Sequence, residues 1–500
     1  MRRSALAALV LVALSGCAQQ PRPAVGPGRP SPPKRGVRAL QADLASYYRA
    51  QTFSNAMWGV RVRSLKTGET LFAMNPGTFL MPASNMKVVT LAAAAERLGW
   101  DYTFQTKVVA AGAIEGGILK GDLVVIGGGD PTLGGRPAGG PSIVETWADQ
   151  IRAAGITSIE GRIIGDDNTF DDEGLGQGWS WDYLASGYAT PVGALGFNEN
   201  IVRLALQPGA AVGDPVTIEA RPEGSGLLLD AAVRTVAREG EVDVTLARLP
   251  GSRLLGVTGT VPVGRTGVTQ TVSVDNPTEF MVGALRSALV SRGVQVAGDA
   301  IDVDTLPAPQ DLSAAQVLVA YTSPPLSQIG KVLLKVSQNL YADTLLKAMG
   351  RPAGGGPATT REGRAAVRDV LKSWGILPDA YVQADGSGLS RYNYLTADVL
   401  VAVLTRMHQD ERHRAFFSDA LPLAGVDGTI ASRMKDSKAQ GNARAKTGSI
   451  ANARALSGYV TSANGEPLVF SMIVNNFNVP QSEADAIIDR AVVRLAEFRR

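Results

Sequence analysis

The chain has 500 residues, of which 45% are hydrophobic and 19% are charged, a composition typical of globular proteins. A chain of this length is too long to fold around a single hydrophobic core, so we expect two or three domains. The 49 Lys and Arg residues outnumber the 46 Asp and Glu residues by only three, which argues against a nucleic-acid-binding protein.

The N-terminus has the pattern of an export signal. The basic start MRR precedes the apolar run ALAALVLVAL and the small-residue sequence LSGC, which ends at Cys17. This run is too short to span a bilayer, so we interpret residues 1–17 as a signal peptide. Small residues directly before a cysteine resemble a bacterial lipobox, in which Cys17 becomes the lipidated first residue of the mature protein.

Cys17 is the one cysteine of the chain, so its thiol is free for a thioether-linked lipid. A lipid anchor holds a protein at a membrane surface without spanning the bilayer. We therefore expect an exported, lipid-anchored protein on the periplasmic side of the cell envelope. An ordinary signal peptide with an incidental cysteine is the alternative. Residues 18–38, rich in Pro, Gly and Arg, predict a semi-extended tether.

The remaining elements follow in chain order. Residues 58–76 alternate apolar and polar side chains around a Thr-Gly turn, which predicts a β-hairpin, and a helix follows. Residues 102–319 consist of short, Gly-punctuated strands with two helical pieces. Helical periodicity returns after residue 323, and the C-terminus predicts three strands and a final amphipathic helix.

These elements predict an α+β fold in which an antiparallel sheet is packed with helices. Residues 39–101 and 320–500 form one domain built from both ends of the chain. Residues 102–319 form a large β-rich insertion of one or two subdomains.

The predicted helix after the hairpin carries a candidate catalytic pair in the sequence SNMK, Ser84 and Lys87. Positions three apart lie on one face of a helix, so the amine can approach the serine hydroxyl. A desolvated lysine can be neutral and act as a base. The backbone N–H of Ser84 would be one of the unpaired donors of the first turn, which suits an oxyanion hole.

Other serine chemistry fits the sequence less well. The two histidines, His408 and His413, lie in the charged stretch MHQDERHR and are predicted to face solvent, and no G-x-S-x-G motif accompanies them. No H-E-x-x-H zinc motif is present, so we expect neither a metal nor another cofactor. Lysine is then the expected base.

Two further motifs complete a set. SQN at residues 337–339 supplies Ser337 and Asn339 from a turn in a helix-rich segment, and KTG at residues 446–448 supplies Lys446 at the start of a strand. Together with S-x-x-K they match the signature of penicillin-binding proteins and serine β-lactamases. Single motifs recur by chance at Ser31–Lys34, Ser432–Lys435, Lys66–Gly68 and Ser462–Asn464, but only one choice gives the order helix, turn, strand.

The long insertion between Lys87 and Ser337 makes the chain resemble class C low-molecular-mass penicillin-binding proteins, the D-alanyl-D-alanine carboxypeptidase/endopeptidase family. The resemblance covers nearly the whole mature chain and includes residues 178–202, 385–393, 425–433 and 444–450. It implies a penicillin-binding/serine β-lactamase-like transpeptidase domain. The implied substrates are peptidoglycan stem peptides, and the implied inhibitors are β-lactams.

The same resemblance implies a role for each motif residue. Ser84 attacks the carbonyl between two D-alanines and forms an acyl-enzyme, and Lys87 takes its proton. Ser337, assisted by Lys446, relays a proton to the leaving amine, and Asn339 binds the acyl-side amide. Thr447 and Ser449 hold the substrate's terminal carboxylate, with Gly448 between them in the substrate-binding strand, and the backbone N–H groups of Ser84 and Ser449 form the oxyanion hole.

A pocket in the insertion is a further hypothesis. Trp179, Asp182 and Tyr188 could bind the side chain of the stem peptide, where an acidic residue suits the ammonium of a diamino acid. Aromatic packing in a small subdomain with an exposed aspartate is the open alternative. Asp385, Ser387 and Arg391 could support the cleft, although Asp-Gly-Ser-Gly is also ordinary turn chemistry.

The leading functional prediction is a serine peptidase that cuts the terminal D-Ala-D-Ala bond, the peptidoglycan cross-link, or both. A serine β-lactamase shares the motifs, but the counterpart of the auxiliary glutamate of class A enzymes is not recognisable here. A non-catalytic, peptidoglycan-binding lipoprotein is the third possibility. The intact set of Ser, Lys, Ser, Asn and Lys weighs against it, because a binding protein has no use for a base beside a nucleophile.

Overall fold

The structure is a computed structural model of the chain that describes residues 36–135, 142–222 and 224–500. The predicted signal peptide, Cys17 and most of the tether lie outside these residues, as does the chance motif at Ser31–Lys34. None of the helices in the described part of the chain has the length and hydrophobicity needed to cross a membrane.

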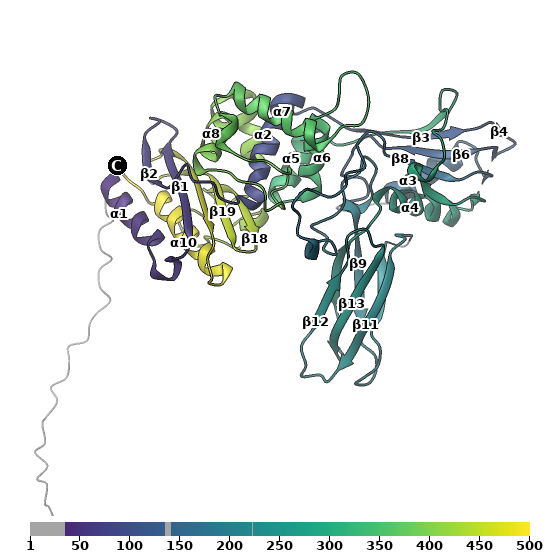
Figure 1. The fold of residues 1–500 in the computed structure, drawn as a ribbon, viewed down its shortest axis with the longest axis horizontal. Coiled ribbons are helices and arrows are strands. Elements are labelled where there is room, and N and C mark those ends of the chain that lie inside the picture. The colour runs from purple at the N-terminus through teal and green to yellow at the C-terminus, as the bar shows by residue number, and fades with distance from the viewer. Residues whose placement is uncertain (1–35, 136–141, 223) are drawn as a thin grey trace, which may run out of the picture.

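A five-stranded antiparallel sheet joins the two ends of the chain (Figure 1). Its strand order is β18-β19-β20-β1-β2, so the first and last thirds of the sequence meet where β1 pairs with β20. The hairpin and the three C-terminal strands agree with the sequence prediction. The strand bounds are β1 Met57–Ser64, β2 Thr70–Met74, β18 Arg444–Ile450, β19 Ala453–Thr461 and β20 Pro467–Asn475.

Helices cover both faces of this sheet, and alternation along the central strand β20 explains why. Phe470 and Met472 face a core with two terminal helices, whereas Val469 and Ile473 face a core with six helices from the middle of this domain. The first set is α1 Val37–Tyr48 and α10 Gln481–Ala496. The second set is α2 Met86–Leu98, α5 Leu326–Lys335, α6 Asn339–Met349, α7 Thr360–Ser373, α8 Ala397–Gln409 and α9 Glu411–Ala420.

The inserted region leaves and rejoins this part of the molecule through two adjacent strands. β3 (Gln105–Ala111) pairs antiparallel with β17 (Gln316–Thr322). Just outside them, the N–H of Ser323 donates to the carbonyl of Phe104 at 3.0 Å. Residues 320–322 therefore continue the closing strand of the insertion, and the Pro324–Pro325 pair ends it.

The insertion itself has two parts (Figure 1). One combines two helices with a five-stranded sheet, β16-β8-β6-β3-β17, and a four-stranded sheet, β15-β7-β5-β4. The other contains two three-stranded sheets, β10-β9-β14 and β11-β13-β12, and is itself inserted between β8 and α4. The bounds of the first part are β4 Ile114–Glu115, β5 Ile118–Leu119, β6 Asp122–Ile126, α3 Ile143–Ala153, β7 Ser158–Ile159, β8 Ile163–Asp166, α4 Pro277–Ser291, β15 Gln295–Val296 and β16 Ala300–Asp302. Those of the second are β9 Ile201–Gln207, β10 Thr217–Arg221, β11 Leu228–Val236, β12 Asp243–Ala247, β13 Leu254–Pro262 and β14 Val268–Ser273.

Candidate active site

Ser84 and Lys87 lie at the entry to the buried helix α2. Ser84 is in a short 3-10 turn, Ala83–Asn85, which precedes α2 directly. The residue before it, Ala83, has the left-handed backbone angle φ 47°, a strained conformation that recurs at functional sites. Lys87 is fully buried, and its Nζ donates to Ser84 Oγ at 3.0 Å. The predicted pair is therefore in direct contact.

The amine of Lys87 has two further acceptors. Nζ donates to the carbonyl oxygen of Ser387 at 2.6 Å and to Asn339 Oδ1 at 2.5 Å. Three acceptors match the three N–H groups of an ammonium ion. Because these acceptors come from distant parts of the chain, they fix the position of the Lys87 amine. Asn339, one of the predicted motif residues, thus contacts Lys87 and also lines the cavity described below.

Burial lowers the pKa of Lys87 from its ordinary value to about 8, against the opposing charges of Asp343 and Asp385. Burial raises the pKa of Asp343 to about 7, and repulsion by Asp385 adds to this. Asp343 Oδ1 accepts from the backbone N–H groups of Gly386 at 2.6 Å and Ser387 at 3.1 Å. The Asp343 carboxylate therefore raises the pKa of Lys87, and it also orients the Ser387 segment whose carbonyl accepts from Lys87.

Ser337 and Lys446 form a second hydroxyl–amine pair. Ser337 lies between α5 and α6 and has the left-handed backbone angle φ 64°. Lys446 is fully buried, and its Nζ donates to Ser337 Oγ at 2.8 Å and to the carbonyl of Thr447 at 2.8 Å. Burial lowers the pKa of Lys446 well below its ordinary value, and the nearby charge of Lys87 lowers it further.

Strand β18 presents an open backbone edge beside the nucleophile. β18 is the last strand of its sheet, and the N–H of Ala445 donates to the carbonyl of Pro422 at 2.9 Å, away from β19. Successive residues of a strand alternate between its two sides, so the N–H groups of Thr447 and Ser449 point to the same open edge. This edge can pair with an extended peptide.

Gly448 allows this strand to approach the turn that carries Ser84. A Cβ atom at residue 448 would lie 2.4 Å from the carbonyl oxygen of Pro82 and 2.8 Å from Asn85 Nδ2. Real Cβ atoms do not come this close to a backbone oxygen. The glycine of the KTG motif is thus required by packing.

A cavity of about 480 Å³ brings the predicted residues together. Its size suits a small-molecule or peptide ligand. Tyr183 and Tyr188 line one side, and their rings make an edge-to-face contact with centroids 5.6 Å apart. The other lining residues are Ser84, Ser337, Asn339, Gly388, Leu389, Ser449, Ile450, Ala451 and Gln481.

The three residues predicted for the insertion pocket lie in different places. Tyr188 lines the cavity, and its carbonyl accepts from Asn339 Nδ2 at 2.7 Å. Trp179 Nε1 donates to Asp385 Oδ2 at 2.9 Å, so this side chain supports the Asp-Gly-Ser-Gly turn. Asp182 is exposed and is not among the residues that line the cavity.

Several residues of the site were not singled out from the sequence. Asp343 follows Asn339 by one helical turn on α6, a spacing that could have identified it. Tyr183 lines the cavity and receives a hydrogen bond from Arg391 Nη2 at 3.3 Å. Lys347, 2% exposed, contacts the carboxylate of Asp171 at 2.5 Å and ties α6 to the insertion. The local sequence around Lys347 gives no indication that it pairs with Asp171.

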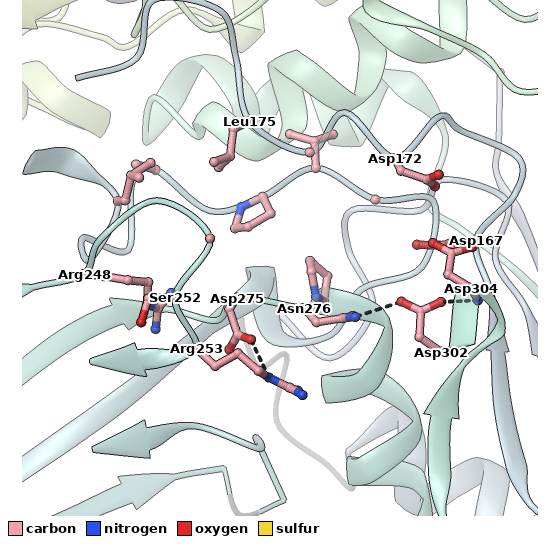
Figure 2. Close-up of a pocket in the computed structure, with 18 of the residues that line it drawn as sticks. Asp167, Asp172, Leu175, Arg248, Ser252, Arg253, Asp275, Asn276, Asp302 and Asp304 are labelled. Atoms are coloured by element: carbon pink, nitrogen blue, oxygen red, sulfur yellow. Dashed lines mark hydrogen bonds and ion pairs between the residues drawn. The ribbon is translucent and has the colours of Figure 1, made fainter. Parts of the chain in front are cut away.

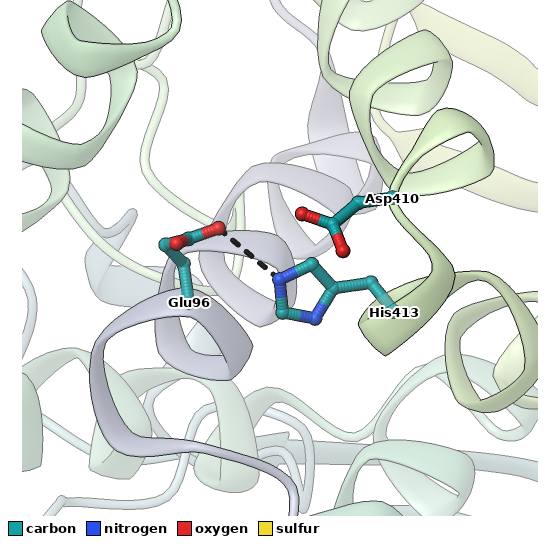
Figure 3. Close-up of side chains that lie close together, drawn as sticks. All are labelled: Glu96, Asp410 and His413. Carbon is teal, nitrogen blue, oxygen red and sulfur yellow. Dashed lines mark hydrogen bonds and ion pairs between the residues drawn. The ribbon is translucent and has the colours of Figure 1, made fainter.

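The prediction that both histidines face solvent is wrong for His413. His413 is 2% exposed, and its ring lies against Glu96 and near Asp410 (Figure 3). Trp100 Nε1 donates to His413 Nδ1 at 3.1 Å, so Nε2 carries the proton shared with Glu96, also at 3.1 Å. Both ring nitrogens are occupied by structural partners, and neither partner is a serine.

The chance motifs within the described residues have simple structural explanations. Ser432 and Lys435 are both exposed, in a turn-rich segment before β18. Lys66–Gly68 forms the turn between β1 and β2, and Ser462–Asn464 the turn between β19 and β20. The three motifs SNMK, SQN and KTG are thus the ones whose residues meet at one cavity.

Comparison with known proteins gives the family. Residues 40–498 match the D-Ala-D-Ala carboxypeptidase 3 (S13) family. The D-alanyl-D-alanine carboxypeptidase of Actinomadura sp. (strain R39) is 33% identical over 470 residues, which cover 92% of this chain and 85% of that protein. D-alanyl-D-alanine carboxypeptidase DacB of Haemophilus influenzae is 26% identical over 431 residues, covering 85% of this chain and 87% of its own.

Among solved structures, penicillin binding protein 4 (dacB) from Haemophilus influenzae matches with a TM-score of 0.80 and 25% identity. The match covers 91% of this chain and 99% of that one. This agreement confirms the predicted α+β, transpeptidase-like fold. The chain therefore belongs to the D-Ala-D-Ala carboxypeptidase 3 (S13) family.

Proposed function

We propose that the chain is a serine D,D-peptidase that cleaves the bond between two D-alanines of peptidoglycan stem peptides through an acyl-enzyme on Ser84. The observation that carries this proposal is the fully buried amine of Lys87 at 3.0 Å from Ser84 Oγ, at a cavity that also contains Ser337. Family membership supports the same reaction.

Acylation begins with a neutral Lys87. A pKa of about 8 leaves a useful fraction of the amine unprotonated near neutral pH. Ser84 Oγ forms a bond to the carbonyl carbon of the penultimate D-alanine while its proton passes to Lys87 Nζ. The C–N bond then breaks, and the departing amine takes a proton from Ser337 Oγ, which Lys446 Nζ at 2.8 Å supports.

The negative charge of the tetrahedral intermediate forms beside two backbone donors, the N–H groups of Ser84 and Ser449. The open edge of β18 pairs with the substrate backbone, and the hydroxyls of Thr447 and Ser449 bind the terminal carboxylate. Asn339 binds the acyl-side amide. A water molecule then attacks the ester carbonyl and gives its proton to Ser337 Oγ, which lost one to the leaving amine. Lys87 Nζ returns its proton to Ser84 Oγ as the ester bond breaks, so both hydroxyl–amine pairs are restored.

The direct test is the release of D-alanine from a pentapeptide that ends in D-Ala-D-Ala. Wild-type protein should release it, and Ser84→Ala should release none above background. Equal, negligible release from both proteins would favour a peptidoglycan-binding protein without activity. Cross-linked muropeptides in the same assay separate endopeptidase from carboxypeptidase activity.

A serine β-lactamase is the enzymatic alternative, and its deacylation rate distinguishes it. We expect penicillin to acylate Ser84 and to remain as a stable adduct, which makes β-lactams inhibitors. Labelled penicillin that turns over rapidly and leaves no persistent adduct would identify a β-lactamase instead.

We also propose that the protein is exported and held at the envelope membrane by a lipid on Cys17. The sequence LSGC and the Pro-rich residues after it support this. Wild-type protein should incorporate labelled palmitate and sediment with membranes. Cys17→Ser should lose both properties, and a membrane-bound, unlabelled Cys17→Ser protein would disprove the anchor.

We propose that Tyr188 and Asp182 meet the stem-peptide side chain from different positions, and that Trp179 acts on this contact only indirectly. Tyr188 lines the cavity, Trp179 supports the turn at Asp385, and the exposed Asp182 can meet an ammonium group from solvent. Asp182→Asn should raise KM for a diamino-acid-containing peptide and leave KM for an uncharged analogue unchanged. Equal effects on both peptides would refute this assignment.

A further inference from the structure

A second cavity lies in the inserted region and shares no lining residue with the active-site cavity. Its volume is about 350 Å³, within the range of small-ligand sites. Figure 2 shows Arg248 and Ser252 on one side of it and Asp167, Asp302 and Asp304 on the other. The reaction proposed above uses none of these residues.

The acidic end of this cavity concentrates negative charge in little space. Oxygen atoms of Asp167, Asp302 and Asp304 lie within 4.8 Å of one another, and Asp302 is only 6% exposed. Asp167 Oδ1 is buried and has no hydrogen-bond partner within the described residues. Burial raises the pKa of Asp167 to about 6, and repulsion by Asp302 and Asp304 adds to this. A cationic group would relieve the repulsion and satisfy the free oxygen.

The opposite end holds a buried guanidinium with free donors, near the opposite charge of Asp275. Arg248 is 7% exposed, and its Nη1 donates to Ser273 Oγ at 3.1 Å. Its Nε and Nη2 have no hydrogen-bond partner among the residues that the structure describes. Arg253 differs, because its guanidinium already contacts Asp275 and Glu279. A buried guanidinium with free donors is costly unless an anion meets it.

We propose that this cavity binds an amino acid with a cationic side chain, or a short peptide that carries one, with its carboxylate at Arg248 and its ammonium at Asp167, Asp302 and Asp304. Such a ligand carries one charge of the sign opposite to each end of the cavity. A divalent cation would satisfy only the acidic end and would leave Arg248 unpaired. A simple anion would leave the three carboxylates facing one another.

The cavity lies behind one wall of the active site. Leu184 and Ala189 line it, whereas their neighbours Tyr183 and Tyr188 line the active-site cavity. The ligand would therefore contact the reverse side of the segment that faces the substrate. The proposal does not depend on the peptidase activity, because binding is measured with the active site blocked.

The test is calorimetric titration of the full-length protein with lysine, both enantiomers in turn, after treatment with penicillin. Saturable binding of one lysine per protein is expected. Cadaverine, which lacks the carboxylate, should bind at least about 10-fold more weakly. Arg248→Met should weaken lysine binding at least about 30-fold, the usual cost of removing one partner of a buried charge pair.

Two further variants keep the result interpretable. Asp304→Asn alters the exposed member of the acidic end, so it should fold normally and still weaken binding. Arg152→Gln, an exposed change on α3, is the control and should bind like the wild type. Equal lysine affinity in Arg248→Met and wild type would overturn the proposal. Calcium that binds more tightly than lysine and displaces it would also do so, and it would identify a metal site.

Discussion

Replacing Asp343 by asparagine should move the pH dependence of Ser84 acylation to lower pH. The buried carboxylate of Asp343 raises the pKa of Lys87, so removing its charge favours the neutral amine. Asparagine retains an oxygen that can accept from the N–H groups of Gly386 and Ser387, as Asp343 Oδ1 does. The substitution therefore changes charge with little change in hydrogen bonding.

The size of the shift depends on how strongly the charge of Asp343 acts on Lys87, which it does by raising the lysine pKa. One nearby opposite charge typically shifts a pKa by about one unit, so loss of the Asp343 charge should lower the acidic inflection by about one unit, or about 1.4 kcal/mol. Asp385 is unchanged in this variant and still raises the pKa of Lys87, which limits the shift. Near pH 7 the variant should then be acylated about 5-fold faster than wild type, and the difference should shrink at lower pH, where Asp343 of the wild type is itself protonated.

The assay is the second-order rate constant for acylation by a fluorescent penicillin, measured from pH 5 to pH 10 at an ionic strength of about 0.15 M. Asp343→Ala is the companion variant, since it removes the charge together with both hydrogen bonds to the Ser387 segment. It should be slow at every pH. An inflection in Asp343→Asn that is unchanged, or that moves to higher pH, would refute the assigned electrostatic role.

Two further predictions concern packing around the site. Gly448→Ala should slow acylation of Ser84 by roughly 100-fold, because the new Cβ would lie 2.4 Å from the Pro82 carbonyl oxygen and push β18 away from Ser84. Gly77→Ala is the control, since a Cβ at residue 77 has no atom within 4 Å and should not change acylation. Lys347→Met should lower the unfolding free energy by about 2–3 kcal/mol in urea titrations, since it breaks a buried ion pair. Lys331→Met, which removes an exposed ion pair, should change stability little.

Each of these predictions has an outcome that contradicts it. Normal acylation by Gly448→Ala would mean that β18 tolerates a wider spacing from the nucleophile's turn. Equal urea midpoints for Lys347→Met and Lys331→Met would mean that the buried Lys347–Asp171 ion pair contributes no more to the unfolding free energy than the exposed Lys331–Asp419 pair.

The sequence predicted the parts of the site that rest on local patterns. Ser84 and Lys87 are one helical turn apart, so their contact follows from helix geometry. Ser337 and Lys446 are 109 residues apart and still pair at 2.8 Å. The order of the motifs, and the resemblance built on it, identified this pair, because spacing alone carries no information over that distance.

What the sequence missed depends on tertiary contacts. His413 lies among charged residues, yet packing of α9 against Trp100 and Glu96 buries it. The predicted turn at residues 337–339 does separate α5 from α6, but the left-handed backbone angle of Ser337 within it has no signal in the local sequence. Lys347 is buried because the inserted region folds back onto α6, a contact between segments 176 residues apart.

The proposed reaction requires the buried amine of Lys87 to activate Ser84 and no other serine. Brief exposure to penicillin followed by peptide mapping by mass spectrometry identifies the acylated residue. We expect one adduct, on the peptide that contains Ser84. It should disappear in Ser84→Ala, form far more slowly in Lys87→Ala, and be unchanged in the exposed variant Ser432→Ala. An adduct on another serine, or equally fast labelling of Lys87→Ala, would contradict the proposed reaction.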